Sequence, residues 1–276
     1  MLTQLSDLTP YFERIGFTGI AKPDLESLRT LHRLHPFSIP FENLSPLLGE
    51  PVLLTADALE NKLIHGQRGG YCFEQNALFM GVLRSIGFEV LPLAARVVWN
   101  RDQPEPNPRT HMALLVEIES ERYLCDVGFG GATLTAPLLL RENAIQPTPH
   151  EPCRILSTDT GFTVEVRLES EWRAAYEFDL QRQLAIDYEA MNHFVQTHAS
   201  SPFTKTLMVA KPDSRGRYTL RGIELRRYED GSLLQTHYLD SAESLADVLQ
   251  EVFRIALPAD PRLPATLSRL VASGRA

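Results

Sequence analysis

The chain has 276 residues, of which 43% are hydrophobic and 22% are charged, and this ordinary globular composition excludes disordered and fibrous proteins. The length favours two or three lobes around a shared cleft over one compact core. The formal net charge is -8 at pH 7, and no basic run is longer than the pair Arg226 and Arg227, so the electrostatic footprint of a nucleic-acid-binding protein is missing.

The cysteines and the N-terminal residues predict a cytoplasmic protein. Cys72, Cys125 and Cys153 form no closely spaced pair, which favours free thiols over a disulfide framework and argues against a structural zinc site. The first seven residues lack a basic start and an apolar stretch of signal-peptide length, and no run of about 18 apolar residues occurs. We therefore expect no membrane association and no bound metal.

The N-terminal third of the chain is predicted to be a helical lobe. The expected helices cover residues 9–16, 24–35, 55–65 and 72–87. Gly16 and Gly87 stand where the first and last of these helices should end. The second helix is expected to end near His35 because Pro36 follows, and we expect His32 and His35 to lie on a surface-like helix.

After residue 87 the sequence changes to β-branched and alternating runs. The strands expected in residues 88–186 cover residues 88–99, 111–118, 122–127, 161–168 and 172–178. Clusters of Asn, Asp, Pro and Gly separate these runs, as in an antiparallel sheet or a barrel made of one, and the proline-rich residues 104–108 should form a loop.

Residues 187–276 mix helical and strand patterns. We expect helices over residues 188–196 and 240–257 and strands over residues 218–226 and 232–238, with Glu243 completing a capping box that Asp240 begins.

The sharpest local signal is the segment RGGYCFEQN at residues 68–76. Gly69 and Gly70 allow a tight turn into a helix, and Cys72 falls in its first turn, where unpaired N–H groups and the positive end of the helix dipole favour a thiolate. A thiolate is the nucleophile that acyl transfer requires. The competing interpretation is that Cys72 is a small buried hydrophobic residue, as most free cysteines are.

A cysteine nucleophile needs a base, and the base needs an orienting partner. His111 begins one expected strand and Asp126 lies near the end of the next, so a hairpin that turns near residues 119–121 places both at the same end of the sheet. Adjacent strands lie about 4.8 Å apart, which brings an imidazole and a carboxylate within hydrogen-bonding reach. The competing interpretation is that His111 has only a structural role in its strand and that Asp126 ends its strand as a turn residue. His193 and His198 are the other candidates for the base.

Together these motifs resemble those of the arylamine N-acetyltransferase family. The motifs are residues 37–44 (FSIPFENL), 68–76, 110–112 (THM), 126–130 (DVGFG) and 201–203 (SPF). They occur in the family's order and at family-like intervals, and the chain length also matches. Beyond Leu207 the resemblance carries little, so the last lobe is assigned by position.

The resemblance implies an α+β fold of three lobes around a papain-like or transglutaminase-like catalytic core. The lobes would be a helical bundle (residues 1–87) that carries the nucleophile, a central antiparallel β-barrel (residues 88–186) that carries His111 and Asp126, and a C-terminal α/β lid (residues 187–276). Cys72 would be the nucleophile, His111 the base and Asp126 its orienting partner.

The resemblance also implies a pocket shared by CoA and the acceptor. Its lining would include Phe37, Trp99, Thr110, Gly128, Phe129, Gly130 and Phe203. The aromatic residues among them suit a hydrophobic core equally well, and the glycine-rich residues 128–131 alone indicate only a loop with N–H groups available to a phosphate. Glu42 and Arg68 are expected to form an ion pair that holds the Cys72 loop.

The implied function is acetyl transfer from acetyl-CoA, as a co-substrate, to a small arylamine, arylhydrazine or N-hydroxyarylamine in xenobiotic metabolism. The mechanism would be ping-pong through an acetyl-cysteine. The same triad order also fits a CoA-independent amide synthase or a hydrolase related to cysteine peptidases, although Phe73 stands where such peptidases usually place Trp. The physiological acceptor, the acyl-chain range of the donor and the oligomeric state are not encoded in any motif.

A non-enzymatic alternative is a metal-binding module of Cys72, His111, Cys125 and Asp126. Cys125 and Asp126 are neighbours on one expected strand and point to opposite faces, so they cannot readily bind one ion.

Overall fold

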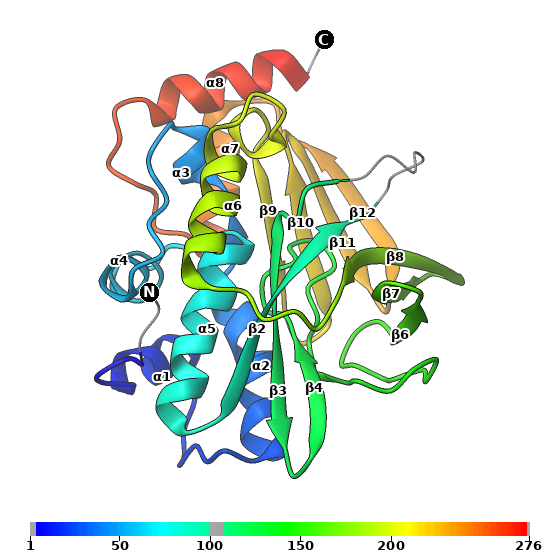
Figure 1. Cartoon of the computed structure of the whole chain (residues 1–276). Coiled ribbons are helices and arrows are strands. Elements are labelled where there is room, and N and C mark those ends of the chain that lie inside the picture. The colour runs from blue at the N-terminus through cyan, green and yellow to red at the C-terminus, as the bar shows by residue number, and fades with distance from the viewer. Residues whose placement is uncertain (1–3, 100–106, 275–276) are drawn as a thin grey trace.

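A computed structural model describes residues 4–99 and 107–274 of the chain (Figure 1). The helices are α1 (Thr9–Ile15), α2 (Leu25–Ser38), α3 (Leu44–Leu47), α4 (Ala56–Leu59), α5 (Cys72–Ile86), α6 (Ala185–Thr197), α7 (Ala242–Glu251) and α8 (Leu263–Gly274), with a π-helical turn η1 (Glu60–His65) and a 3-10 turn η2 (Pro202–Thr204). The strands are β1 (Phe41–Glu42), β2 (Glu89–Val97), β3 (His111–Ile118), β4 (Glu121–Cys125), β5 (Leu138–Leu139), β6 (Cys153–Thr158), β7 (Gly161–Leu168), β8 (Glu171–Phe178), β9 (Met208–Pro212), β10 (Gly216–Arg221), β11 (Glu224–Glu229) and β12 (Ser232–Tyr238). The predicted α+β class is confirmed. Within the described ranges, no helix combines the length and apolarity needed to cross a membrane.

The larger sheet is a nearly closed antiparallel barrel of seven strands in the order β5-β4-β3-β2-β8-β7-β6. Bridges from residues 142 and 146 to β6 bring the chain after β5 against the opposite edge of the sheet. The expected hairpin is present: β3 pairs with β4, and the turn residues Glu119 and Ser120 adopt left-handed φ angles of 49° and 67°. Of the proline-rich loop predicted at residues 104–108, residues 104–106 lie outside the described residues.

The smaller sheet joins one strand from the N-terminal part of the chain to four strands from the C-terminal part. Its order is β1-β9-β10-β11-β12, and β1 pairs with β9 through Phe41 opposite Ala210. The single strand predicted over residues 218–226 is wrong, because Gly222 adopts a left-handed φ of 60° and turns the chain between β10 and β11. Helix α8, which was not predicted, packs its buried leucines into the hydrophobic cluster beside this sheet.

Helix α5 confirms its predicted bounds and forms the centre of the N-terminal core. Residues 72–83 are all buried, and Gly87 closes the helix with a left-handed φ of 106°. Figure 1 shows α5 alongside β2 and β3 of the barrel. The first residue of this helix therefore lies between the helical cluster and the barrel.

Helix α2 differs from its prediction in length and burial. It continues through Pro36 to Ser38, and His32 and His35 are both fully buried, so the expected end at residue 35 and the surface-like helix are wrong. The proline removes one backbone hydrogen bond, but it is itself buried in the packed interior, which compensates for the loss. Helix α7 also starts later than predicted, because the Ser241 hydroxyl, rather than Asp240, accepts the Ser244 N–H at 3.1 Å.

Three hydrophobic clusters form the interior. The first surrounds α5, the second lies between the smaller sheet and helices α7 and α8, and the third fills the barrel. The predicted lobe boundaries after residues 87 and 186 stay predictions.

Candidate active site

Cys72 is the first residue of α5 and is 4% exposed. The first backbone bond of the helix runs from the Gln75 N–H to the Tyr71 carbonyl oxygen, so the N–H groups of residues 72–74 have no partner within the helix. These donors and the helix dipole direct positive potential at the region of the thiol. The Cys72 Sγ lies 3.5 Å from the Thr110 carbonyl oxygen, immediately before β3.

The glycines before Cys72 are required by close contacts rather than by left-handed backbone angles. A Cβ on Gly69 would lie 2.0 Å from the Pro40 carbonyl oxygen, and one on Gly70 would lie 2.7 Å from a carboxylate oxygen of Glu74. The Gly70 N–H donates to Pro40, and the Glu42 N–H donates to Gly70. The loop is thus fixed against β1 at a distance that no larger residue permits.

His111 and Asp126 meet as the hairpin predicted. The imidazole Nε2 lies 2.7 Å from Asp126 Oδ2, and both side chains are buried, with exposures of 2% and 0%. His111 opens β3, while Asp126 directly follows the end of β4, so the two residues share one end of the sheet. Since Nε2 faces Asp126, the other ring nitrogen remains for the thiol.

The electrostatics of this pair favour an ion pair. Burial alone would lower the pKa of His111, but the charge and hydrogen bond of Asp126, together with the interaction with Cys72, raise that pKa to about 10. Burial alone would raise the pKa of Asp126, but His111, Asn76 and the Gly128 N–H hold it below its usual value. At neutral pH the site therefore holds an imidazolium and a carboxylate.

Asn76, on the second turn of α5, holds Asp126 against the helix and was missed as a site residue. Its Nδ2 donates to Asp126 Oδ1 at 2.9 Å and to the Met112 carbonyl at 2.7 Å, while its Oδ1 accepts the Val127 N–H at 3.0 Å. The Gly128 N–H also donates to Asp126 Oδ1, at 2.9 Å. One amide therefore joins the element that carries the thiol to those that carry the imidazole and the carboxylate.

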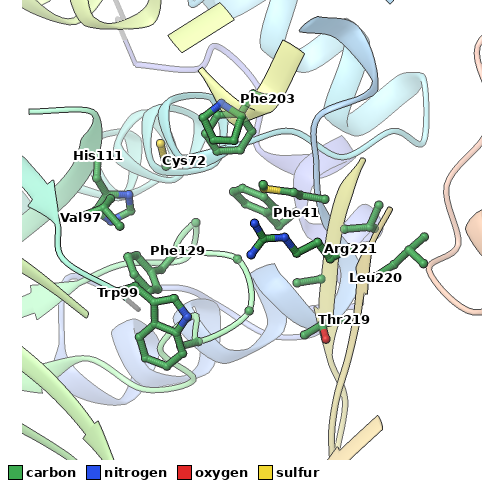
Figure 2. A pocket seen from close by; sticks show the side chains of 18 of the residues that line it. Phe41, Cys72, Val97, Trp99, His111, Phe129, Phe203, Thr219, Leu220 and Arg221 are labelled. Atoms are coloured by element: carbon green, nitrogen blue, oxygen red, sulfur yellow. The ribbon is translucent and has the colours of Figure 1, made fainter. Parts of the chain in front are cut away.

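Cys72 and His111 line a cavity of about 940 Å³, and the fully buried Asp126 contacts His111 without lining it. Among the predicted pocket residues, those that line it are Trp99, Thr110, Gly128, Phe129, Gly130 and Phe203. Figure 2 shows Cys72 and His111 on one wall, Phe129 and Trp99 below them, and Arg221 reaching in from β10. Neither His193 nor His198, the other candidate bases, belongs to this lining.

Phe37 does not line the cavity, contrary to its predicted place. Its ring packs edge-on against His150 at 5.7 Å between centroids. Phe41 lines the cavity instead, with 6.1 Å between its ring centroid and that of Phe203. Phe37 lies on α2 and Phe41 on β1, and the chain turns between them. Only the Phe41 ring therefore reaches the cavity that Cys72 lines.

The segment after Phe41 fixes the site through its polar residues. Arg68 pairs with Glu42 at 2.7 and 2.9 Å, with exposures of 12% and 0%, which confirms the expected ion pair. Asn43 donates to the carbonyl oxygens of Phe203 and Thr206, at 2.8 Å each. The FENL motif thereby holds both the loop before Cys72 and the loop that carries Phe203.

The glycine-rich loop passes beside Cys72. A Cβ on Gly128 would lie 3.0 Å from the Cys72 Cα, and Gly130 adopts a left-handed φ of 84°. Arg217 of β10 donates to the Gly131 carbonyl oxygen at 3.0 Å and forms a buried ion pair with Glu151.

The described residues contain no group of three or more His, Cys, Asp or Glu side chains arranged to hold a metal ion.

Comparison with known proteins decides the family. The sequence profile of a family described as N-acetyltransferase matches residues 24–262. An arylamine N-acetyltransferase of Escherichia coli K12 is 40% identical over 91% of this chain and 89% of its own length, and one of Mycolicibacterium smegmatis is 42% identical over 91% and 92%. The chain belongs to the arylamine N-acetyltransferase family.

Solved structures of arylamine N-acetyltransferases share this fold. A structure of the Mycobacterium smegmatis enzyme has a TM-score of 0.92 at 40% identity and covers 96% of this chain and 99% of its own. A Mycobacterium marinum arylamine N-acetyltransferase in complex with CoA has a TM-score of 0.91 at 38% identity, with coverages of 96% and 99%. The family, the fold and the assignment as an acyltransferase that transfers acetyl groups are therefore confirmed.

Proposed function

We propose that this arylamine N-acetyltransferase works by a ping-pong mechanism, with acetyl-CoA as donor and acetyl-Cys72 as intermediate. The observation that carries the proposal is that His111, paired with Asp126 at 2.7 Å, lines the same cavity as Cys72, which stands at a helix N-terminus. This is the arrangement that an activated thiol nucleophile requires. The structure of the Mycobacterium marinum relative in complex with CoA supports the choice of donor.

In the first half-reaction the Cys72 thiolate attacks the thioester carbonyl carbon of acetyl-CoA. The new bond between Cys72 and the acetyl carbon leaves negative charge on the carbonyl oxygen, and backbone N–H groups at the start of α5 stabilise it. When this adduct collapses, the bond to the CoA sulfur breaks. The CoA thiolate takes the proton of the His111 imidazolium, which leaves His111 neutral.

In the second half-reaction the amine nitrogen of the acceptor attacks the acetyl carbon. Neutral His111 accepts the proton that the nitrogen loses, and the bond to Cys72 breaks to restore the thiolate and imidazolium. Asp126 stays ionised throughout and stabilises the charged ring.

The cavity supplies the acceptor specificity in this proposal. Phe129 packs edge-on against both Trp99 and His111, at 6.0 and 5.2 Å, so an aromatic ring on the acceptor finds aromatic partners beside the base. Arylamines, arylhydrazines and N-hydroxyarylamines share such a ring. A relative from Salmonella typhimurium is named an arylamine N-acetyltransferase and N-hydroxyarylamine O-acetyltransferase, which supports the last class.

The proposal is tested by CoA release in the absence of acceptor. Mixing the enzyme with excess acetyl-CoA should release a rapid burst of about one equivalent of CoA per active site, followed by slow hydrolysis. Adding an arylamine should then restore turnover, and double-reciprocal plots against both substrates should be parallel. The matched control is Cys153→Ala, which removes a buried thiol of the barrel and should keep the burst. A burst that persists in Cys72→Ala, or CoA release that requires acceptor in the wild type, would contradict the proposal.

A further inference from the structure

Helix α2 carries two fully buried histidines that the proposed chemistry does not use. His32 and His35 are three residues apart and therefore lie on the same side of the helix. The His35 ring is bonded to Tyr11 at 2.9 Å and to Gln75 at 2.7 Å. His32 instead accepts the backbone N–H of Asp126, whose carboxylate belongs to the proposed triad.

The contact between His32 and Asp126 is made by the backbone of Asp126. Its N–H donates to His32 Nε2 at 3.1 Å. Asp126 lies just beyond the end of β4, where the sheet no longer supplies a partner, and it is fully buried. Without His32 this N–H would be a buried donor facing no acceptor, which is costly in a protein interior.

The other ring nitrogen of His32 does not share this role. Nδ1 is buried and has no hydrogen-bond partner within the described part of the chain, and the ring meets Phe79 edge-on at 5.8 Å between centroids. A histidine that accepts through Nε2 in its neutral form carries its proton on Nδ1. Among the residues that the structure describes, the ring therefore makes a hydrogen bond through Nε2 only, and this nitrogen accepts the Asp126 N–H.

The charge state of His32 agrees with this assignment. Burial lowers the pKa of His32, and the nearby charge of Asp126 raises it by less, so that the pKa is about 4. At neutral pH the ring is uncharged and Nε2 keeps its lone pair. A protonated ring would have no acceptor to offer.

The carboxylate of Asp126 has hydrogen bonds to three other residues. Oδ2 faces His111 on β3, while Oδ1 accepts from Asn76 on α5 and from the Gly128 N–H. The Gly128 bond is local to the same loop and fixes no position relative to the rest of the fold. His32 supplies an anchor for the Asp126 main chain from a separate helix.

We propose that His32 is a positioning residue of the triad, which fixes the main chain of Asp126 through Nε2 so that the carboxylate keeps its alignment with His111. This inference rests on the proposed function. His32 touches neither substrate nor the reacting atoms, and it acts through Asp126 alone.

The tautomer of His32 tests the proposal in the unaltered enzyme. In the nitrogen-15 spectrum of histidine-labelled protein at neutral pH, His32 should be neutral with its proton on Nδ1 and an unprotonated Nε2. A proton on Nε2, or a charged ring, would overturn the proposal, because neither form accepts the Asp126 N–H.

Two substitutions test the consequence for catalysis. His32→Leu removes the acceptor, and we expect the rate of CoA release during acylation to fall about tenfold to hundredfold, with KM for acetyl-CoA unchanged. The titration midpoint of His111 should fall as well, because its carboxylate partner is no longer held in line. His32→Gln returns an acceptor oxygen at the position of Nε2 and should restore most of the rate and the midpoint.

His35→Leu is the matched control. It removes an equally buried histidine from the same face of α2 together with two hydrogen bonds, but it leaves every contact of Asp126 in place. We expect it to lower the melting temperature without moving the His111 midpoint. Equal shifts of the midpoint in both leucine variants, or a folded His32→Leu enzyme with the wild-type acylation rate, would reject the positioning role. Failure of the wild-type enzyme to acylate at all would instead reject the proposed function.

Discussion

Asp126 is a fully buried carboxylate whose charge is kept by its neighbours. Each of its oxygens receives a hydrogen bond, from His111 on one side and from Asn76 and Gly128 on the other. This negative charge is in turn the main cause that raises the pKa of His111 against the effect of burial. The charge of one residue therefore sets the protonation of the other.

Asp126→Asn should consequently lower the pKa of His111. With the carboxylate gone, burial dominates, and the titration midpoint of His111 should drop from about 10 to below its ordinary 6.5. The carbon-13 shift of the labelled ring, followed against pH, measures this midpoint. A midpoint that stays near 10 in the variant would show that another group holds the proton.

The same shift predicts how stability depends on pH. The pKa of His111 is higher in the folded state than the 6.5 of an unperturbed histidine, so its stabilising contribution is fully present below pH 6.5 and is lost as the pH rises to about 10. Urea unfolding of the wild type and of His111→Gln should therefore show the largest difference in unfolding free energy at the acid end of this window. A difference that grows with pH would have the wrong sign for this account.

The residues of the proposed triad could be singled out from residue type and local spacing. Cys72 stood out through its glycines and helix start, and His111 and Asp126 through their symmetry about one hairpin turn. His32 and Asn76 were not found as site residues, because each acts on the main chain of a segment distant in sequence. No local pattern marks such a contact.

At the scale of elements, the loop before Cys72 depends on the ion pair between Arg68 and Glu42. Glu42 is 0% exposed, and Arg68→Ala would leave its charge buried without its partner. We expect the unfolding free energy to fall by about 3–5 kcal/mol, measured by urea unfolding, with loss of soluble protein before loss of chemistry.

Arg226→Ala is the control for that substitution. Arg226 pairs with Glu224 at 2.8 Å but is 42% exposed, so its removal should cost at most about 1 kcal/mol. Equal losses from both variants, or a stable but inactive Arg68→Ala enzyme, would contradict the structural role of the buried pair.

Elements were predictable where the sequence carries a boundary residue that acts locally. Helix α5 runs from Cys72 to Ile86 with Gly87 as its cap, and β3 has its predicted bounds. Pro36 did not end α2, because burial of the proline side chain outweighs the one backbone hydrogen bond that it removes. Gly222 was overlooked as the turn that divides the predicted strand over residues 218–226.

The whole molecule brings the cavity together from segments that are distant in sequence. Phe41 and Phe203 both line it and pack together, with 6.1 Å between ring centroids. Strand β1 joins the sheet of β9 and β10, and Arg217 of β10 ties that sheet to the barrel through Glu151. Motif order in the sequence indicated that these segments belong together. The long-range pairing of β1 with β9 and the exchange of Phe37 for Phe41 follow only from the three-dimensional packing.

Arg217→Ala tests this connection. Both partners of the Glu151 pair are 4% exposed, so loss of the guanidinium leaves a buried carboxylate and frees the Gly131 carbonyl. We expect the unfolding free energy to fall by about 3–5 kcal/mol and KM for acetyl-CoA to rise as the glycine-rich loop loses its support.

The control is Arg262→Ala. The Arg262 side chain is 51% exposed in its pair with Asp260, so its removal should lower the unfolding free energy by at most about 1 kcal/mol. If Arg217→Ala is as stable as this control and binds acetyl-CoA normally, then the ion pair does not support the loop.

The most direct test of the central claim is the site of the acetyl group after reaction with acetyl-CoA alone. Intact mass spectrometry of the rapidly quenched enzyme should show the addition of one acetyl group, and peptide mapping should place it on Cys72 as a thioester that an arylamine removes. An acetyl group on any other residue, or an unmodified enzyme that still acetylates the amine, would contradict the account.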